Sequence, residues 1–151
     1  MQADQIKNTK EAYACMYENV KMGADSIINL LPKVEDSHLK SDMTVHLSGY
    51  EDFAQRAKKE LENMGVKAEE KGFMSKAMAR VGMEMNTITD TSASHIAEMM
   101  MQGSQMGVIE MHKCINACNR CACDVDSSAT NMAREIVSFE EKNLERMKQY
   151  L

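Results

Sequence analysis

The sequence predicts an all-α protein built as a four-helix bundle, and three observations lead to this expectation. Only one of the 151 residues is proline, so long stretches of the chain are free to be helical. In four long segments apolar residues recur at alternating spacings of three and four, the period of a buried helix face. No segment shows the sustained apolar–polar alternation that is typical of strands. We therefore expect a single helical domain over residues 1–151.

The first two long helices are expected over residues 4–31 and 36–64. Pro32 ends the first, because a proline disfavours the helical conformation of the residue before it. Asp36 can cap the start of the second, and Gly65 stands where a left-handed residue ends it. The inward stripe of the first comprises Tyr13, Met16, Val20, Ala24, Ile27 and Leu31, and that of the second Leu39, Met43, His46, Tyr50, Phe53, Ala57, Leu61 and Met64.

Two long helices and one short helix are expected in the second half. The short helix carries Met74, Met78, Val81, Met85 and Ile88. The stretch 87–92, which is polar except for Ile88, interrupts this helix. Asp90 or Ser92 then caps the third long helix. That helix carries one broad face of Ile96, Met99, Met100, Gly103, Met106, Gly107, Met111, Cys114, Cys118 and Cys121. After a break at residues 123–127, the last helix places Met132, Ile136, Phe139, Met147 and Leu151 inward.

The lengths of the connections predict the topology. A short turn joins the first two long helices and another joins the last two, so each pair forms an antiparallel hairpin. Residues 65–91 are numerous enough to cross the bundle from end to end. Two hairpins joined by one long crossover, here with a short extra helix in it, are the ferritin-like arrangement of the four-helix bundle.

Three short segments of the sequence resemble a known group of proteins, and the resemblance extends over nearly the whole chain. They are residues 22–31 (MGADSIINLL), 49–54 (GYEDFA) and 94–100 (SHIAEMM). The chain resembles small bacterial ferritin-like bundle proteins of uncharacterised function. The resemblance implies the fold and the binding of metals through carboxylates, which is common in this family. It implies no mechanism.

Charge and composition exclude several classes of function. A net charge of −5 argues against a nucleic-acid binder and against docking on anionic membranes. No run approaches the roughly 18 apolar residues of a membrane span. The polar start lacks the apolar core of a signal peptide, and five cysteines, an odd number, fit a reducing compartment, so we expect a cytoplasmic protein. Nucleotide-binding loops and nucleophile elbows are missing from the sequence.

A thiol cluster near the end of the third long helix is the leading candidate metal site. Cys114, Cys118 and Cys121 share one helix face, and Cys123 follows near the turn. With His112, such ligands suit Zn²⁺, whereas cysteines with methionines suit Cu(I). The expected topology also brings Cys15 to this end of the bundle. The alternative is that these cysteines are buried as small apolar residues.

Carboxylates and histidines offer a second candidate, a degenerate di-iron site of the ferritin type. Its residues are His46, Glu51, His95, Glu98 and Glu140. The Glu-x-x-His pairs of such sites are absent from the sequence. The nearest match, residues 95–98, has the histidine before the glutamate. The alternative, which we favour, is a core polar layer in which His46 hydrogen-bonds to a tyrosine or glutamate. Its other members are Tyr13, Tyr17, Tyr50, Glu110, Glu140 and Asn143.

The 16 methionines and the glycine spacing of the third long helix complete the expectations. Most of the methionines fall on the inward stripes, where they replace leucine. Gly103 and Gly107 admit a close helix crossing or a bulky aromatic side chain of a neighbouring helix, and with residues 99–101 they mark a dimer surface. We thus expect a homo-oligomer, a dimer first, with no nucleic-acid or membrane partner. The function favoured is a non-enzymatic bundle that binds Zn, Cu(I) or Fe through its cysteine-rich end; the alternatives are the degenerate oxidase and a metal-free interaction module.

Overall fold

The computed structural model of the chain describes residue 3 and residues 6–68, 88–122 and 124–151. These residues form four α-helices and no strand, which confirms the all-α class and the four-helix bundle. The helices are α1 (Thr9–Leu30), α2 (Ser37–Asn63), α4 (Ala93–Arg120) and α5 (Ser127–Met147). Short 3₁₀ turns, η2 (Leu31–Lys33) and η3 (Lys148–Tyr150), follow α1 and α5. The short helix expected around residues 74–88 lies outside the described residues up to position 87.

Side chains cap the starts of three helices. Asn8 accepts a hydrogen bond from the backbone N–H of Glu11, so α1 begins at Thr9, later than the sequence predicted. Asp36 accepts from the N–H of Leu39 at 2.8 Å, as expected. Of the two caps proposed for α4, Ser92 is the residue that accepts from His95.

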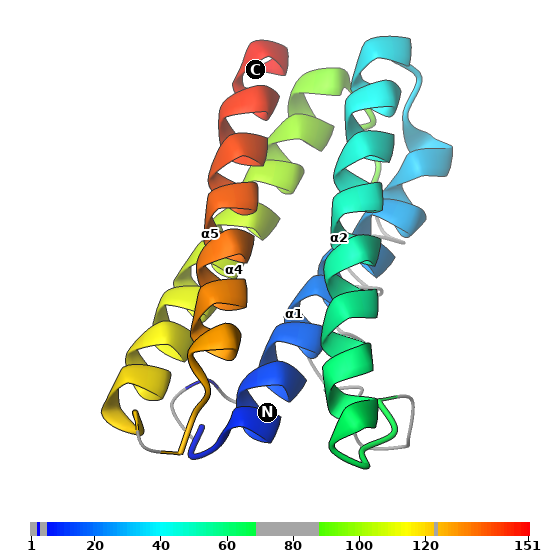
Figure 1. Cartoon of the computed structure of the whole chain (residues 1–151). Coiled ribbons are helices and arrows are strands. Elements are labelled where there is room, and N and C mark those ends of the chain that lie inside the picture. Colours follow the sequence, from blue (N-terminus) through cyan, green and yellow to red (C-terminus); the bar gives the residue numbers. More distant parts are fainter. Residues whose placement is uncertain (1–2, 4–5, 69–87, 123) are drawn as a thin grey trace.

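The helices form two antiparallel hairpins that face each other. α1 packs against α2 and α4 packs against α5, while α1 also contacts α4 and α2 contacts α5. α1 and α5 run toward one end of the bundle, and α2 and α4 run toward the other (Figure 1). α2 therefore ends, and α4 begins, at opposite ends of the bundle. Most of the connection, residues 69–87, lies outside the described residues, so the predicted crossover stays a prediction.

The buried stripes match the prediction closely on α1 and α2 and less well on α4 and α5. Leu30 is buried in place of Leu31, because the chain tightens into the 3₁₀ turn at Pro32. The buried stripe of α4 passes through Ser104 rather than Gly103 and Met106, and the Met106 side chain is 57% exposed. Met64 and Leu151 are exposed rather than inward. None of the described helices is long and apolar enough to cross a membrane.

Candidate functional site

A buried carboxylate lies at the centre of the bundle. Glu140 projects from α5, and its side chain is 1% exposed. The hydroxyl of Tyr50, on α2, donates to both carboxylate oxygens, at 2.7 Å to Oε1 and 2.9 Å to Oε2. His46 lies one turn earlier on α2, where its ring stacks on the Tyr50 ring with centroids 4.7 Å apart. Its Nε2 is 3.7 Å from Glu140 Oε2, which is too far for a hydrogen bond.

Two glycines on facing helices make room for these side chains. A Cβ atom on Gly107 of α4 would lie 2.6 Å from Glu140 Oε1. A Cβ atom on Gly23 of α1 would lie 2.5 Å from the Tyr50 ring. Each glycine thus admits a bulky polar side chain of a neighbouring helix. The sequence predicted an aromatic neighbour for Gly107, but the side chain that lies against it is the Glu140 carboxylate.

Burial fixes the protonation of the tyrosine. The pKa of Tyr50 is raised well above its usual value, first by burial and then by the negative charge of Glu140 and the hydrogen bond to it. These three causes favour the neutral phenol and outweigh the opposite effect of the neighbouring Ser104 hydroxyl. Tyr50 therefore keeps its proton at neutral pH and acts as a hydrogen-bond donor to Glu140.

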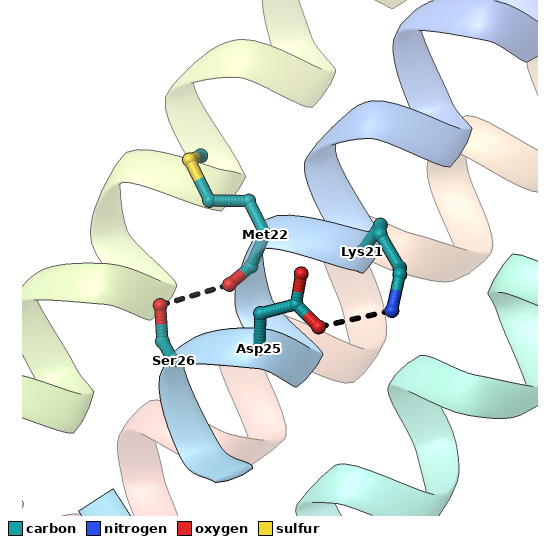
Figure 2. A network of polar contacts seen from close by, with 4 residues as sticks. All are labelled: Lys21, Met22, Asp25 and Ser26. Carbon is teal, nitrogen blue, oxygen red and sulfur yellow. Dashed lines mark hydrogen bonds and ion pairs between the residues drawn. The ribbon is translucent and has the colours of Figure 1, made fainter. Parts of the chain in front are cut away.

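A pocket of about 150 Å³ opens beside this cluster, between α1, α4 and the buried polar residues. Its polar part includes His46, Tyr50, Ser104 and Glu140, while its walls are mainly apolar, with Met22, Ile27, Leu30, Met99, Met100 and Met106. Met22 projects from α1 toward α4 in Figure 2. The pocket reaches the surface along α4, where Gly103 and Met106 are exposed.

Three side-chain atoms in the pocket wall have no hydrogen-bond partner among the described residues. They are Nδ1 and Nε2 of His46 and Oγ of Ser104, and both side chains are about 1% exposed. Asn143 Nδ2, one turn beyond Glu140 on α5, is likewise unpartnered. The expectation that His46 hydrogen-bonds to a tyrosine or glutamate is therefore wrong. The Tyr50 hydroxyl donates to the Glu140 carboxylate instead, because the longer tyrosine side chain reaches both oxygens.

The other members of the expected polar layer lie elsewhere. The hydroxyl of Tyr13 donates to Ser128 at 3.0 Å. Glu110 is only partly buried and accepts a hydrogen bond from Lys113. The layer is therefore smaller than the sequence indicated, and its acid comes from α5.

The proposed carboxylate ligands do not gather in the core. His46 and Glu140 are brought together, but Glu51 and Glu98 are exposed. His95 is partly exposed, and its Nδ1 lies 3.8 Å from Glu98 on the same helix. Glu51 follows Tyr50 directly, so the helical turn of about 100° per residue carries it off the buried stripe.

Three of the five cysteines come together where α1 meets α4. Cys15, Cys114 and Cys118 are 5%, 0% and 2% exposed. The Cys114 thiol donates hydrogen bonds to Cys118 and Cys15, and these bonds, followed by burial, raise the pKa of Cys114. The bond with Cys114 lowers the pKa of Cys118 to about 7, and the Thr130 hydroxyl adds to this effect. The approach of Cys15 to the α4 thiols is the one that the expected topology implied.

The remaining predicted thiol-site residues lie apart from this trio. Cys121 is partly buried, and its Sγ is 3.7 Å from the Ile6 carbonyl oxygen. His112 is exposed, because it falls two residues before Cys114 and so faces away from the buried stripe. Cys123 lies outside the described residues. Within the part of the chain that the structure describes, no group of three or more His, Cys, Asp and Glu is placed to hold a metal ion.

Sequence reasoning identified His46, Tyr50 and Glu140 but missed the pocket beside them. A lone hydroxyl residue on a helix, such as Ser104, is by itself a weak signal of a buried site. Its spacing was the available signal, since it lies four residues after Met100 and three before Gly107, on the same stripe. Searches of protein-family models, of curated proteins and of solved structures found no match for this chain.

Proposed function

We propose that this protein is a non-enzymatic, ferritin-like helical bundle that binds a small organic molecule in the pocket between α1 and α4. The observation that carries the proposal is the set of unpartnered atoms on His46 and Ser104, buried in the wall of a 150 Å³ pocket. A buried polar group without a partner costs about 1–3 kcal/mol. A ligand that offers partners to these atoms recovers part of that cost.

The size of the pocket sets the size of the ligand. An apolar cavity of about this volume in another protein holds benzene. The ligand here therefore has roughly five to seven non-hydrogen atoms. The apolar walls and the buried polar end favour a molecule with one polar head and a short hydrocarbon body.

The course of the chain supports the ferritin-like class. Two antiparallel hairpins with a connection that spans the bundle are typical of that class. The high pKa of Tyr50 supports binding rather than proton transfer, because the phenol holds its proton near neutral pH.

Methionine methyl groups offer a direct test of ligand binding. Four methionines, Met22, Met99, Met100 and Met106, line the pocket. In ¹³C-methyl-methionine protein, a saturating small alcohol or amine should shift these four resonances and leave Met16 and Met43, which are buried outside the pocket, unchanged. The matched control is Gly103→Leu, because a Cβ there meets nothing within 4 Å and the added side chain fills the pocket entrance. Shifts that persist in Gly103→Leu, or none in the wild type, would contradict the proposal.

A second candidate function, favoured by the contact of Cys15 with the α4 thiols, is binding of Cu(I). Soft thiolates select Cu(I), and two sulfurs suffice to hold it, so the absence of a three-ligand group among the described residues does not conflict with this candidate. The cytoplasmic location expected from the sequence would keep these thiols reduced.

Competition with a Cu(I) chelator tests this second candidate. The reduced wild-type protein should take one equivalent of Cu(I) from the chelator, and a variant with both Cys15→Ser and Cys114→Ser should take none. Cys121→Ser is the control, because Cys121 lies apart from the buried trio. Equal uptake by the double variant and the wild type would end the hypothesis.

A further inference from the structure

We infer that the ligand of the pocket between α1 and α4 is a small primary alkylammonium ion, with its ammonium group beside Glu140 and its hydrocarbon chain against the methionine wall. This inference rests on the proposed function, since it names the class of molecule that the same pocket takes. Three features carry it: the charge balance of the pocket, the number of acceptors at its polar end and the chemistry of its walls.

The charge balance favours a cation. Among the described residues that line the pocket, Glu140 is the only acidic one and none is lysine or arginine. The His46 ring is the one basic group there, and its Nε2 lies 3.7 Å from Glu140 Oε2, beyond hydrogen-bond distance. Lys21 on α1 precedes the pocket residue Met22, but its Nζ binds Asp25 at 2.9 Å, and Figure 2 shows this pair on the side of α1 away from Met22. A carboxylate that is 1% exposed is costly without a positive partner, so a cationic head stabilises it and an anionic head is repelled.

The hydrogen-bonding capacity of the polar end matches an ammonium group. A primary ammonium carries three N–H donors and no acceptor. The buried end of the pocket offers three acceptor groups: the Glu140 carboxylate, the Ser104 hydroxyl oxygen and the His46 ring, whose nitrogens have no hydrogen-bond partner among the described residues. Ser26 also lines the pocket, and its hydroxyl donates its proton to the Met22 carbonyl at 2.8 Å, which leaves its oxygen as a further acceptor (Figure 2).

The walls suit a short hydrocarbon chain next to a positive charge. Met22, Met99, Met100 and Met106 supply polarizable thioethers, and Ile27 and Leu30 supply aliphatic surface. The Tyr50 ring borders the same space, and aromatic faces attract cations. A hydrated metal ion gains little from such walls, whereas a chain of four or five carbons fills them.

Three probes of similar size, each with a four-carbon chain, separate the possibilities. n-Butylammonium chloride, n-butanol and sodium butyrate are titrated into the full-length protein at matched ionic strength, with methionine methyl shifts and calorimetry as readouts. We expect butylammonium to bind at least tenfold more tightly than butanol and butyrate not to bind. Butanol binding as tightly as butylammonium, or butyrate binding more tightly than either, would overturn the inference while the proposed pocket function stands. If none of the three shifts the pocket methionines, both fail.

A charge-neutral variant tests the role of the carboxylate. Glu140→Gln keeps the shape of the side chain and an oxygen to accept from Tyr50. In this variant the affinity for butylammonium should fall at least tenfold, to that of butanol, while butanol binding persists and shows that the pocket is intact. Ser104→Ala should weaken butylammonium less, because it removes one neutral acceptor. Unchanged amine affinity in Glu140→Gln would contradict the inference.

Discussion

At the scale of single residues, the site depends on a glycine, because its missing side chain leaves space for a neighbour. Glu140 can be buried at the bundle centre only because Gly107 on the facing helix has no side chain. Gly103, one helical turn earlier on α4, has open space around it and no such neighbour. Two glycines on one helix thus have different roles, and packing against Glu140 separates them.

The first prediction compares these two glycines. Gly107→Ala should destabilise the protein by about 1–3 kcal/mol, because the new Cβ displaces the Glu140 carboxylate from its bonds with Tyr50. Gly103→Ala should stabilise it by about 0.5–1 kcal/mol, because alanine favours the helix and meets no neighbour. Urea denaturation of both variants measures the difference. Equal effects of the two substitutions would show that Gly107 is not a packing site for Glu140.

The second prediction concerns alkaline pH and Tyr50. Its pKa in the folded protein lies well above its usual value of 10.0, so its contribution to stability is complete below pH 10. As the pH rises above 10, the unfolded chain releases this proton while the folded protein keeps it, and stability is lost. Above pH 10, the free energy of unfolding of Tyr50→Phe should therefore fall less steeply than that of the wild type, by up to about 1.4 kcal/mol per pH unit.

The same variant should also lose stability at pH 7. Without the hydroxyl, the buried Glu140 carboxylate loses the proton that Tyr50 shares between its two oxygens, a cost of about 1–3 kcal/mol. The ring itself stays, so its contacts with His46 and Phe139 remain. Urea denaturation from pH 7 to 11 gives both quantities. A variant whose stability falls above pH 10 as steeply as that of the wild type would contradict the assignment to Tyr50.

At the scale of elements, α2 begins and ends where its sequence specifies. Asp36 caps its first turn, and Gly65, with φ of 79°, ends it in a left-handed conformation. The Gly65 N–H donates to the Glu62 carbonyl, and the Val66 N–H donates to the Leu61 carbonyl at 2.9 Å. These two bonds satisfy carbonyls that the last helical turn would otherwise leave open.

The third prediction follows from this helix end. Gly65→Ala should destabilise the protein by about 1 kcal/mol, because side chains other than glycine rarely adopt this conformation and nothing else surrounds the site. Gly65→Asn is the matched control and should cost less, since asparagine tolerates left-handed geometry. Thermal unfolding of the two variants checks the order. Alanine as stable as wild type would mean that the helix end relaxes without cost.

At the scale of the whole molecule, the contact of α1 with α4 buries the thiols. Cys15 belongs to the first hairpin, whereas Cys114 and Cys118 belong to the second. Their sulfur contacts form only when the two hairpins have docked, so these contacts report on the tertiary fold.

The fourth prediction uses this burial. In the native protein at pH 7.5, iodoacetamide should leave Cys15, Cys114 and Cys118 unlabelled, although the lowered pKa of Cys118 favours its reactive thiolate. Cys121 is partly exposed and should be labelled earlier. Peptide mass mapping along a urea series should show the three buried thiols reacting together at the unfolding transition. Native labelling of Cys118 at the rate of Cys121 would place it at the surface.

The sequence by itself determined the helical class, the ends of α2, most of the buried stripes and the presence of His46, Tyr50 and Glu140 in the core. These features are local, because helix period, caps and turn residues act within a few positions of the chain. The tertiary structure alone decided that Gly107 leaves room for Glu140 and that Ser104 and His46 line one pocket. It also decided that Glu51, His95 and Glu98 lie outside that pocket. Each of these depends on how one helix is rotated and shifted against another. The rotation is set by packing between helices, and no spacing within a single helix specifies it.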